Sequence, residues 1–216
     1  MSRSSAEVVQ QLLDELGRIV TVYPEGVERT GMAVAELIAG TSFFPGGTGL
    51  WRGDISGGDM PVVFPEKPIM FVGHNFDSIT AHAAAQRNKG EVKTKFWNTL
   101  KDFLRCAGLD PSDCFFTNAL MGLKPGSATG PMPPRPDHRR QCQHFLLRQI
   151  EIVNPRALVT LGGDSEKQRA RAFELSRSRP RLSHRAVMHP STRPFQRRPN
   201  DAEWLKAQAA LIRELL

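Results

Sequence analysis

The sequence predicts an α/β protein: a three-layer α/β/α domain built on a central, mostly parallel sheet of four strands. Two patterns lead to this prediction. Short apolar runs that end in Gly or polar residues alternate along the chain with amphipathic stretches of helical period. Strands that alternate with helices in this way form parallel sheets with helices on both faces. The length of 216 residues allows a single domain with a full core.

The N-terminal part contains one clear helical pattern. Residues 5–20 carry apolar side chains at helical spacing, and we expect an amphipathic helix there. Residues 23–67 are rich in Gly and Pro, which favours loops and a short hairpin. We therefore predict one domain over residues 1–216, in which residues 1–67 precede a core of residues 68–216.

The core has a regular alternation. Four apolar runs are predicted to be buried strands, at residues 68–73, 114–120, 157–163 and 185–188. Four amphipathic stretches are predicted to be helices, at residues 94–108, 138–153, 164–177 and 202–216. Asp164 is a candidate N-cap for the third of these helices.

Composition limits the classes of function. Lys and Arg number 29 against 22 Asp and Glu, a net charge of +7 that suits a polyanion such as DNA. No apolar stretch is long enough to span a membrane and the N-terminus has no signal-peptide pattern, so we expect a cytoplasmic protein, taken to be a monomer. The three cysteines include no CxxC pair, which argues against a disulfide framework.

Polar residues follow each predicted strand. Gly73-His74-Asn75 ends the first strand, Asn118 lies in the second, Gly162-Gly163-Asp164 ends the third, and His189-Pro190-Ser191 follows the fourth. Ligands bind beyond the carboxyl ends of parallel strands. We therefore expect these segments to meet at one rim.

Five motifs in this order resemble the uracil-DNA glycosylase superfamily: FVGHN, GEVKTKFWNTLKDFL, FFTNALMGLKP, ALVTLGGDS and VMHPSTRP. The likeness covers about residues 68–216. Asn75 stands at the position of the water-orienting residue, as in the mismatch-specific and single-strand-selective branches. The four cysteines of the iron–sulfur branches are absent, so no cofactor is expected.

The resemblance implies a role for each matching residue. A DNA glycosylase flips a nucleotide out of the stack, holds the base edge and stabilises the negative charge left on the base. Asn75 would orient the water and His189 would donate a hydrogen bond to the charged carbonyl. Phe96, or its neighbour Trp97, would stack on the base, and Asn118 would read the base edge. The base would also contact Gly73, His74 and Phe76. The DNA strand would contact Ser191 and Arg193.

The loop after the first strand departs from the family pattern. Phe76-Asp77 replaces the usual Pro-Gly or Pro-Tyr, so Asp77 is a second candidate for the catalytic base. Position 74 is His where Gln, Glu, Ile or Met is common. Two metal sites stay open as alternatives, one of His74, Asp77 and His82, and one of Cys142 with His138 or His144.

Three functions are consistent with the sequence. The first is a monofunctional DNA glycosylase that acts on uracil or a related deaminated or mismatched base. The second is a nucleic-acid-binding member of the same fold with little or no excision, motivated by the unusual Asn75-Phe76-Asp77 loop. The third lies outside the family and is a small α/β hydrolase for a nucleoside-like metabolite.

Overall fold

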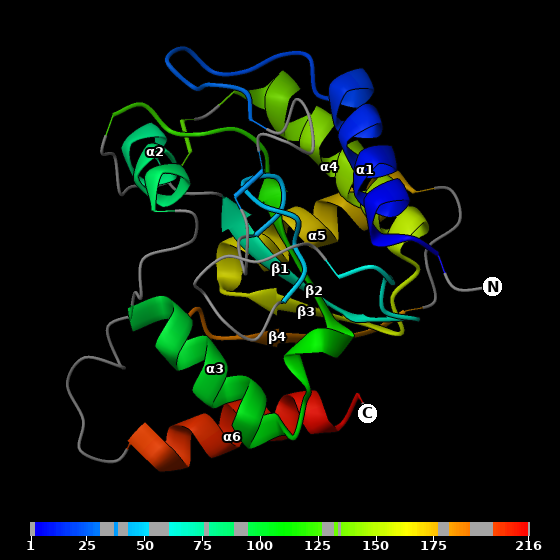
Figure 1. Ribbon diagram of the computed structural model, residues 1–216, viewed down its shortest axis with the longest axis vertical. Coiled ribbons are helices and arrows are strands. Elements are labelled where there is room, and N and C mark those ends of the chain that lie inside the picture. The colour runs from blue at the N-terminus through cyan, green and yellow to red at the C-terminus, as the bar shows by residue number, and fades with distance from the viewer. Residues whose placement is uncertain are drawn as a thin grey trace.

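Four parallel strands form the centre of the protein (Figure 1). The computed structural model describes residues 3–30, 37–38, 43–51, 61–75, 78–88, 95–126, 132–133, 135–176, 182–190 and 201–215. The strands lie in the order β2-β1-β3-β4, and every neighbouring pair is parallel. Their bounds are β1 (Ile69–Asn75), β2 (Cys114–Leu120), β3 (Ala157–Leu161) and β4 (Ser183–Val187). The predicted fold class is therefore confirmed.

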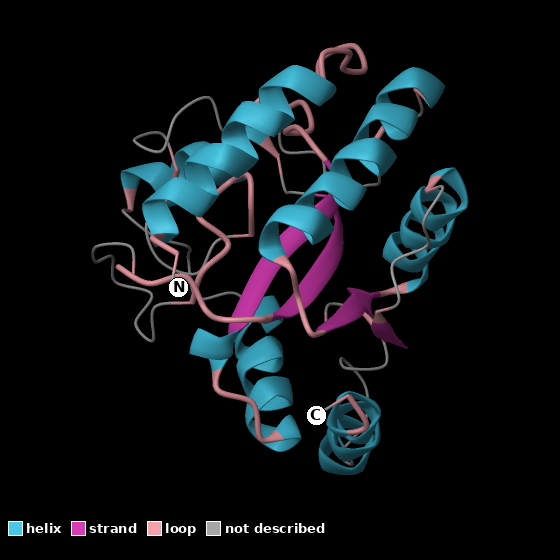
Figure 2. Ribbon diagram, turned by 90° about the vertical axis from the view of Figure 1, so that its right-hand side faces the viewer, coloured by secondary structure: helices cyan, strands magenta, loops and turns pink. Residues whose placement is uncertain are grey.

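Helices cover both faces of the sheet (Figures 1 and 2). One apolar cluster joins Met70, Val72 and Leu158 to α1 (Ser5–Ile19), α4 (Pro136–Val153) and α5 (Gly163–Leu175). A second cluster joins Ile69, Phe71 and Val159 to α3 (Lys95–Ala107) and α6 (Asp201–Arg213). Because successive side chains of a strand point to opposite faces, the continuous apolar runs supply both cores.

Two short helices lie outside the predicted elements. Helix α2 (Ile79–Arg87) begins at Ser78, whose hydroxyl accepts a hydrogen bond from the Ala81 amide at 3.3 Å. Its sequence, ITAHAAAQR, has only a weak apolar stripe, because most of its side chains are small. The 3₁₀ helix η2 (Pro111–Asp113) directly precedes β2.

The predicted cap of α5 is wrong. Gly162 occupies the N-cap position, and no side chain caps the helix. Asp164 lies inside the first turn, where its carboxylate forms an exposed ion pair with Lys167 at 3.3 Å. A carboxylate in the first turn still interacts favourably with the helix dipole.

Part of the Gly- and Pro-rich segment lies along the outer edge of β2. The Phe44 amide donates to the Phe116 carbonyl at 3.0 Å, and the Phe116 amide donates to the Gly49 carbonyl at 2.8 Å. Isolated bridges also join Phe44 to Thr117 and Leu50 to Phe115. Within the described parts of residues 23–67 there is no regular hairpin, contrary to the expectation. The segment 43–51 instead supplies hydrogen-bond partners to a strand edge that would otherwise be open.

The chain connections leave the carboxyl rim of the sheet toward opposite faces. After β1 the chain reaches α3 on one face, whereas after β3 it enters α5 on the opposite face. Since β1 and β3 are neighbours, the connections diverge beyond their carboxyl ends. This is where ligands bind in open α/β sheets.

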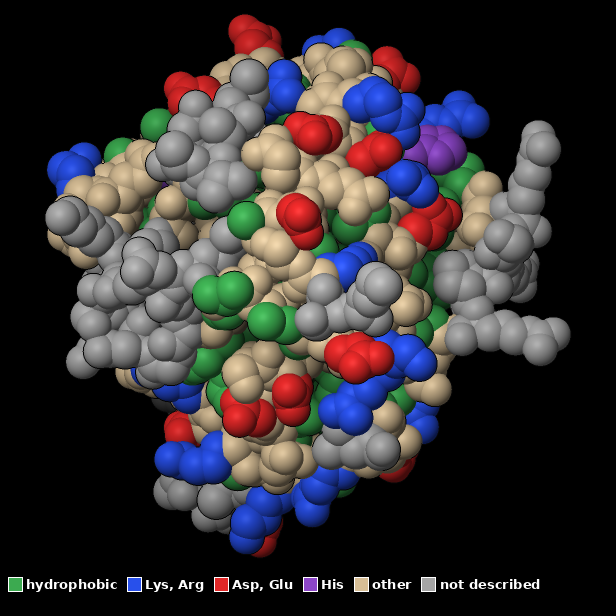
Figure 3. All heavy atoms as spheres, turned by 45° about the vertical axis from the view of Figure 1, so that its right-hand side comes forward, with side chains coloured by type: hydrophobic (Ala, Val, Ile, Leu, Met, Phe, Trp, Pro, Cys, Tyr) green, Lys and Arg blue, Asp and Glu red, His purple; other side chains and the backbone are tan. Residues whose placement is uncertain are grey.

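The face drawn in Figure 3 shows basic and acidic side chains intermixed over the described residues. Among those residues, no helix has the length and apolar character needed to span a membrane.

Candidate active site

Asn118 is held at the carboxyl end of the sheet next to Gly73. The two residues are register partners on β2 and β1, and the Asn118 side chain is 3% exposed. Its Nδ2 donates to the Phe44 carbonyl at 3.4 Å. A Cβ atom at position 73 would lie 2.6 Å from Asn118 Oδ1, closer than van der Waals contact permits. Glycine at position 73 is therefore required for this placement of the amide.

A second glycine makes room for His189, which lies two residues beyond β4. The Gly162 amide donates to the Val187 carbonyl at 2.8 Å. A Cβ atom at position 162 would lie 3.1 Å from His189 Cβ. Gly162 also has a φ of 88°, a conformation that L-residues with side chains rarely adopt.

Phe96 and Trp97, adjacent on α3, have different environments. The Phe96 ring is half-buried and lies beside the His189 imidazole, with 5.4 Å between ring centroids and 34° between planes. Trp97 is 4% exposed and contacts the rings of Trp51 and Phe116 in the core. Phe96, rather than Trp97, is thus the aromatic side chain adjacent to His189.

His74 and Asn75 end β1 at the same rim. Burial lowers the pKa of His74, and the nearby charge of Asp164 and a hydrogen bond with the Asn75 side chain partly offset that effect. Burial also lowers the pKa of His189, and the neighbouring His74 lowers it further. Both imidazoles are therefore held in the neutral form near pH 7, in which each ring carries one N–H donor and one acceptor.

Four predicted site residues lie outside the described residues: Phe76, Asp77, Ser191 and Arg193. Their roles stay predictions. The structure brings together the other predicted residues at the carboxyl rim: Gly73, His74, Asn75, Phe96, Asn118 and His189.

The part of the chain that the structure describes contains no group of three or more His, Cys, Asp or Glu residues arranged to hold a metal ion. Cys142 Sγ does lie 3.3 Å from His138 Nε2, but that ring nitrogen also bonds the Met121 carbonyl at 3.0 Å. Burial raises the pKa of Cys142 to about 12, which disfavours the thiolate that binds metals. His82 belongs to α2, and Asp77, its proposed partner with His74, lies outside the described residues.

Phe43 and Phe44 shape the site but were not predicted from the sequence, and Gly162 was predicted at the rim without a role. Phe43 is 5% exposed and contacts the Phe96 ring edge to face at 5.8 Å. Phe44 supplies the carbonyl that orients Asn118, and Gly162 leaves room for His189. Only the Gly-Gly pair after a predicted strand was a visible signal, because Phe43 and Phe44 lie in a segment without periodicity.

The arrangement has the chemistry of a site for a planar heterocycle. A half-buried aromatic ring can stack on such a heterocycle, and a buried amide can pair with its polar edge. A neutral imidazole can donate a hydrogen bond to an oxygen on which negative charge develops. The rim therefore combines stacking, edge recognition and anion stabilisation.

Comparisons of the sequence with known proteins identify similar proteins. The sequence model of the uracil DNA glycosylase superfamily matches residues 60–213. A type-4 uracil-DNA glycosylase from Thermotoga maritima is 38% identical to this chain over 63 residues, which are 29% of this chain. The match spans 31% of that relative's length.

Proposed function

Because the chain belongs to the uracil-DNA glycosylase superfamily, we propose that it hydrolyses the N-glycosidic bond of uracil, or of a related deaminated or mismatched base, in DNA. The observation that carries this proposal is the convergence of Phe96, Asn118 and His189 at the carboxyl rim of the sheet. The family membership gives no support to the third hypothesis, a hydrolase of nucleoside-like metabolites.

Binding of the flipped base would involve Phe96 and Asn118. The half-buried Phe96 ring offers a face for stacking, which contributes roughly 1–3 kcal/mol per base. Asn118 presents an amide that can donate and accept at once, as the edge of uracil requires. Its position is set by the Phe44 carbonyl and by the absence of a Cβ at Gly73. A rigid amide of this kind discriminates against bases with a mismatched edge.

His189 would stabilise the departing base. Cleavage of the glycosidic bond leaves negative charge on the base, and an imidazole N–H directed at a carbonyl oxygen of the base lowers the energy of that state. The low pKa of His189 favours a neutral donor, so the proton stays on the imidazole while the base leaves as an anion.

Water activation has two candidates, Asn75 and Asp77. The Asn75 side chain bonds to His74 and can orient a water molecule by hydrogen bonding, but an amide cannot accept a proton. Asp77 carries a carboxylate that could act as a general base. We propose Asn75 as the water-orienting residue, because it ends β1 at the rim that carries His189.

The activity can be tested with labelled oligonucleotides that carry uracil, hypoxanthine, xanthine or a thymine mismatch, in single- and double-stranded form. Alkaline strand cleavage after incubation with the protein would reveal excision, and we expect it with at least the uracil substrate. No cleavage of any substrate would contradict a glycosylase activity. Salt-sensitive retention of uncleaved DNA would then favour the alternative, a nucleic-acid-binding member of the fold.

Substitutions separate the two candidates for water activation. We expect Asn75→Ala and His189→Ala to slow excision strongly and Asp77→Asn to retain it. If Asp77→Asn abolishes excision and Asn75→Ala retains it, Asp77 is the base. Circular dichroism of each variant would distinguish loss of chemistry from loss of fold.

We also propose that the chain functions as a single-domain monomer in the cytoplasm. Side chains of α1 and of the segment 43–51 belong to the same apolar cluster as residues of the sheet, which supports one cooperative unit. A single unfolding transition and a sedimentation mass near 24.0 kDa are expected.

A further inference from the structure

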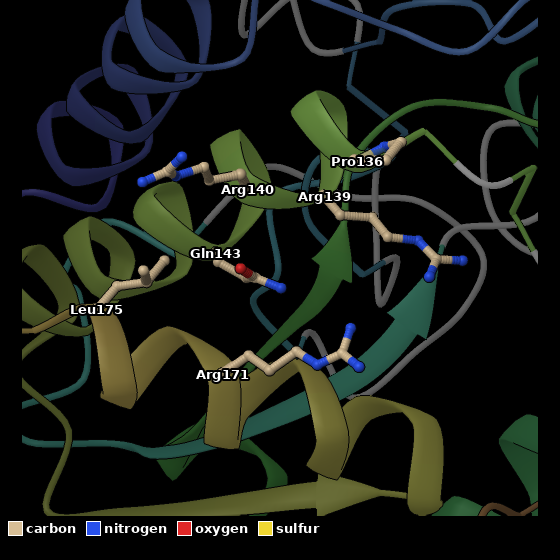
Figure 4. Close-up of a pocket in the computed structure, with 6 residues that line it drawn as sticks. All are labelled: Pro136, Arg139, Arg140, Gln143, Arg171 and Leu175. Carbon is tan, nitrogen blue, oxygen red and sulfur yellow. The ribbon is translucent and has the colours of Figure 1, made fainter.

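A hollow of about 300 Å³ lies between α4 and α5, outside the residues assigned above to base excision (Figure 4). Gln143 Nε2 donates to Gln168 Oε1 at 2.9 Å, and this buried amide pair ties the two helices together. Three of the residues that line the hollow are arginines. The full set is Pro136, Arg139, Arg140, Gln143, Arg171 and Leu175.

Two of these arginines have side chains that extend the same way. Figure 4 shows Arg139 on α4 and Arg171 on α5 reaching in one direction, whereas Arg140 points the opposite way. The Gln143–Gln168 bond joins α4 and α5. The two guanidinium groups that these helices carry therefore form a local positive charge. Like charges repel, so such an arrangement favours an anion between or beside them.

Within the described residues, neither Arg139 nor Arg171 forms an ion pair. Other arginines of the same helices do: Arg148 on α4 pairs with Glu15 and Glu151, and Arg169 on α5 pairs with Glu166. In addition, Arg139 Nε is buried and has no hydrogen-bond partner in the described part of the chain. Arg148 Nε shares this feature, so the lack of an ion pair, rather than the buried nitrogen, distinguishes Arg139.

Among the residues that line the hollow, Arg139 is the one whose charge reaches the rim of the sheet. The charge of Arg139 acts on His74, which lies at the end of β1 beside Asn75. A phosphate close to a nucleotide bound at the rim would therefore be attracted by Arg139. Guanidinium groups match phosphate oxygens in geometry and charge.

We propose that Arg139 and Arg171 bind the phosphodiester backbone of the nucleic acid strand outside the target nucleotide. This inference rests on the proposed function, because it takes DNA at the rim as its starting point. The contacts would be independent of base sequence and would hold the strand in register while the target base enters the site. The group bound is a phosphate, and we propose that it belongs to the nucleic acid strand and not to a free anion.

The test measures binding of an undamaged labelled oligonucleotide of about 20 nucleotides between about 50 and 200 mM salt. Arg139→Gln and Arg171→Gln should each weaken binding and reduce the slope of log K against log salt by about 0.7 to 0.9, the loss of one phosphate contact. Arg139→Lys should largely restore the slope, because the charge is kept. The control is Arg213→Gln, which removes the same charge from an exposed position on α6, across the sheet. This variant should keep the wild-type slope.

Three outcomes overturn the inference. The first is an unchanged slope in both glutamine variants, and the second is an equal loss in Arg213→Gln. The third is loss of binding to inorganic phosphate or a deoxynucleoside monophosphate without loss for the oligonucleotide, which would assign the hollow to a free anion. Uracil excision is assayed in parallel. A protein that excises nothing but shows the expected slopes contradicts the proposed function and supports the hollow as a phosphate site.

Discussion

At the scale of single residues, two glycines determine where the polar groups of the site can lie. Gly73 lets Asn118 Oδ1 approach the β1 backbone, and Gly162 does the same for the Cβ atom of His189. Neither effect depends on contact with a ligand. The site is therefore preorganised by the absence of side chains as well as by the side chains that are present.

Gly73→Ala tests this account. The added Cβ would meet Asn118 Oδ1 at 2.6 Å, so the amide must move away from its present position. Displacement of a group by about 1 Å can reduce a catalytic rate by roughly 100-fold, and we expect a loss of that order in uracil excision. Gly108→Ala would not be a matched control, because Gly108 has a φ of 72°, a conformation in which an alanine is strained. Gly163→Ala is suitable, since nothing lies within 4 Å of its added Cβ. Equal rates for wild type and Gly73→Ala would contradict the proposed role.

Some of these residues could be predicted and others could not. His189 and Asn118 follow or lie within apolar runs, so their place at a strand end is visible from the sequence. Asn118 in fact lies two residues before the end of β2, because the strand continues through Ala119 and Leu120. Phe43 and Phe44 could not be predicted as neighbours of the site, since their contacts are tertiary and no periodic pattern marks them.

At the scale of elements, the segment 43–51 links stability to the site. Phe44 is fully buried, pairs through its backbone with β2, and orients Asn118 through its carbonyl. The strands were predictable because continuous apolar runs mark buried parallel strands, whereas this segment has no such pattern. Helix α2 was missed for a related reason, since its small side chains give little amphipathic signal.

Phe44→Ala should destabilise the protein strongly. Truncating a buried Phe typically costs about 3–5 kcal/mol, the sum of lost apolar burial and the cavity left behind. Urea unfolding monitored by circular dichroism would measure the change. Val62→Ala is the control, because Val62 is 83% exposed and its truncation should alter stability by less than about 0.5 kcal/mol. A Phe44→Ala change as small as that of the control would show that the segment 43–51 contributes little to the core.

At the scale of the whole molecule, buried and half-buried histidines predict loss of stability in mild acid. Of the six histidines, five have a lowered pKa, and burial is the largest cause in each: His74, His82, His138, His184 and His189. In the unfolded chain these groups titrate near pH 6.5, so below that pH the unfolded state binds more protons than the folded state. The free energy of unfolding should therefore fall as the pH drops below about 6.5.

Urea unfolding at several pH values between about 5 and 7 measures this effect, because ordinary carboxylates titrate below that window. Stability is expected to be retained above about pH 6.5 and to decline steadily below it. A flat or rising free energy of unfolding as the pH falls through this window would contradict the lowered pKa values of these histidines.

The central claim is that the carboxyl rim of the sheet excises a base with His189 as the donor to the departing anion. Single-turnover excision of uracil by wild type and by His189→Ala tests it most directly. The wild type should release uracil, and His189→Ala should be slower by roughly 100- to 1000-fold, the usual effect of removing one such donor. His144→Ala, which truncates an exposed histidine on α4, should keep the wild-type rate. No uracil release by the wild type, or equal rates for wild type and His189→Ala, would contradict the claim.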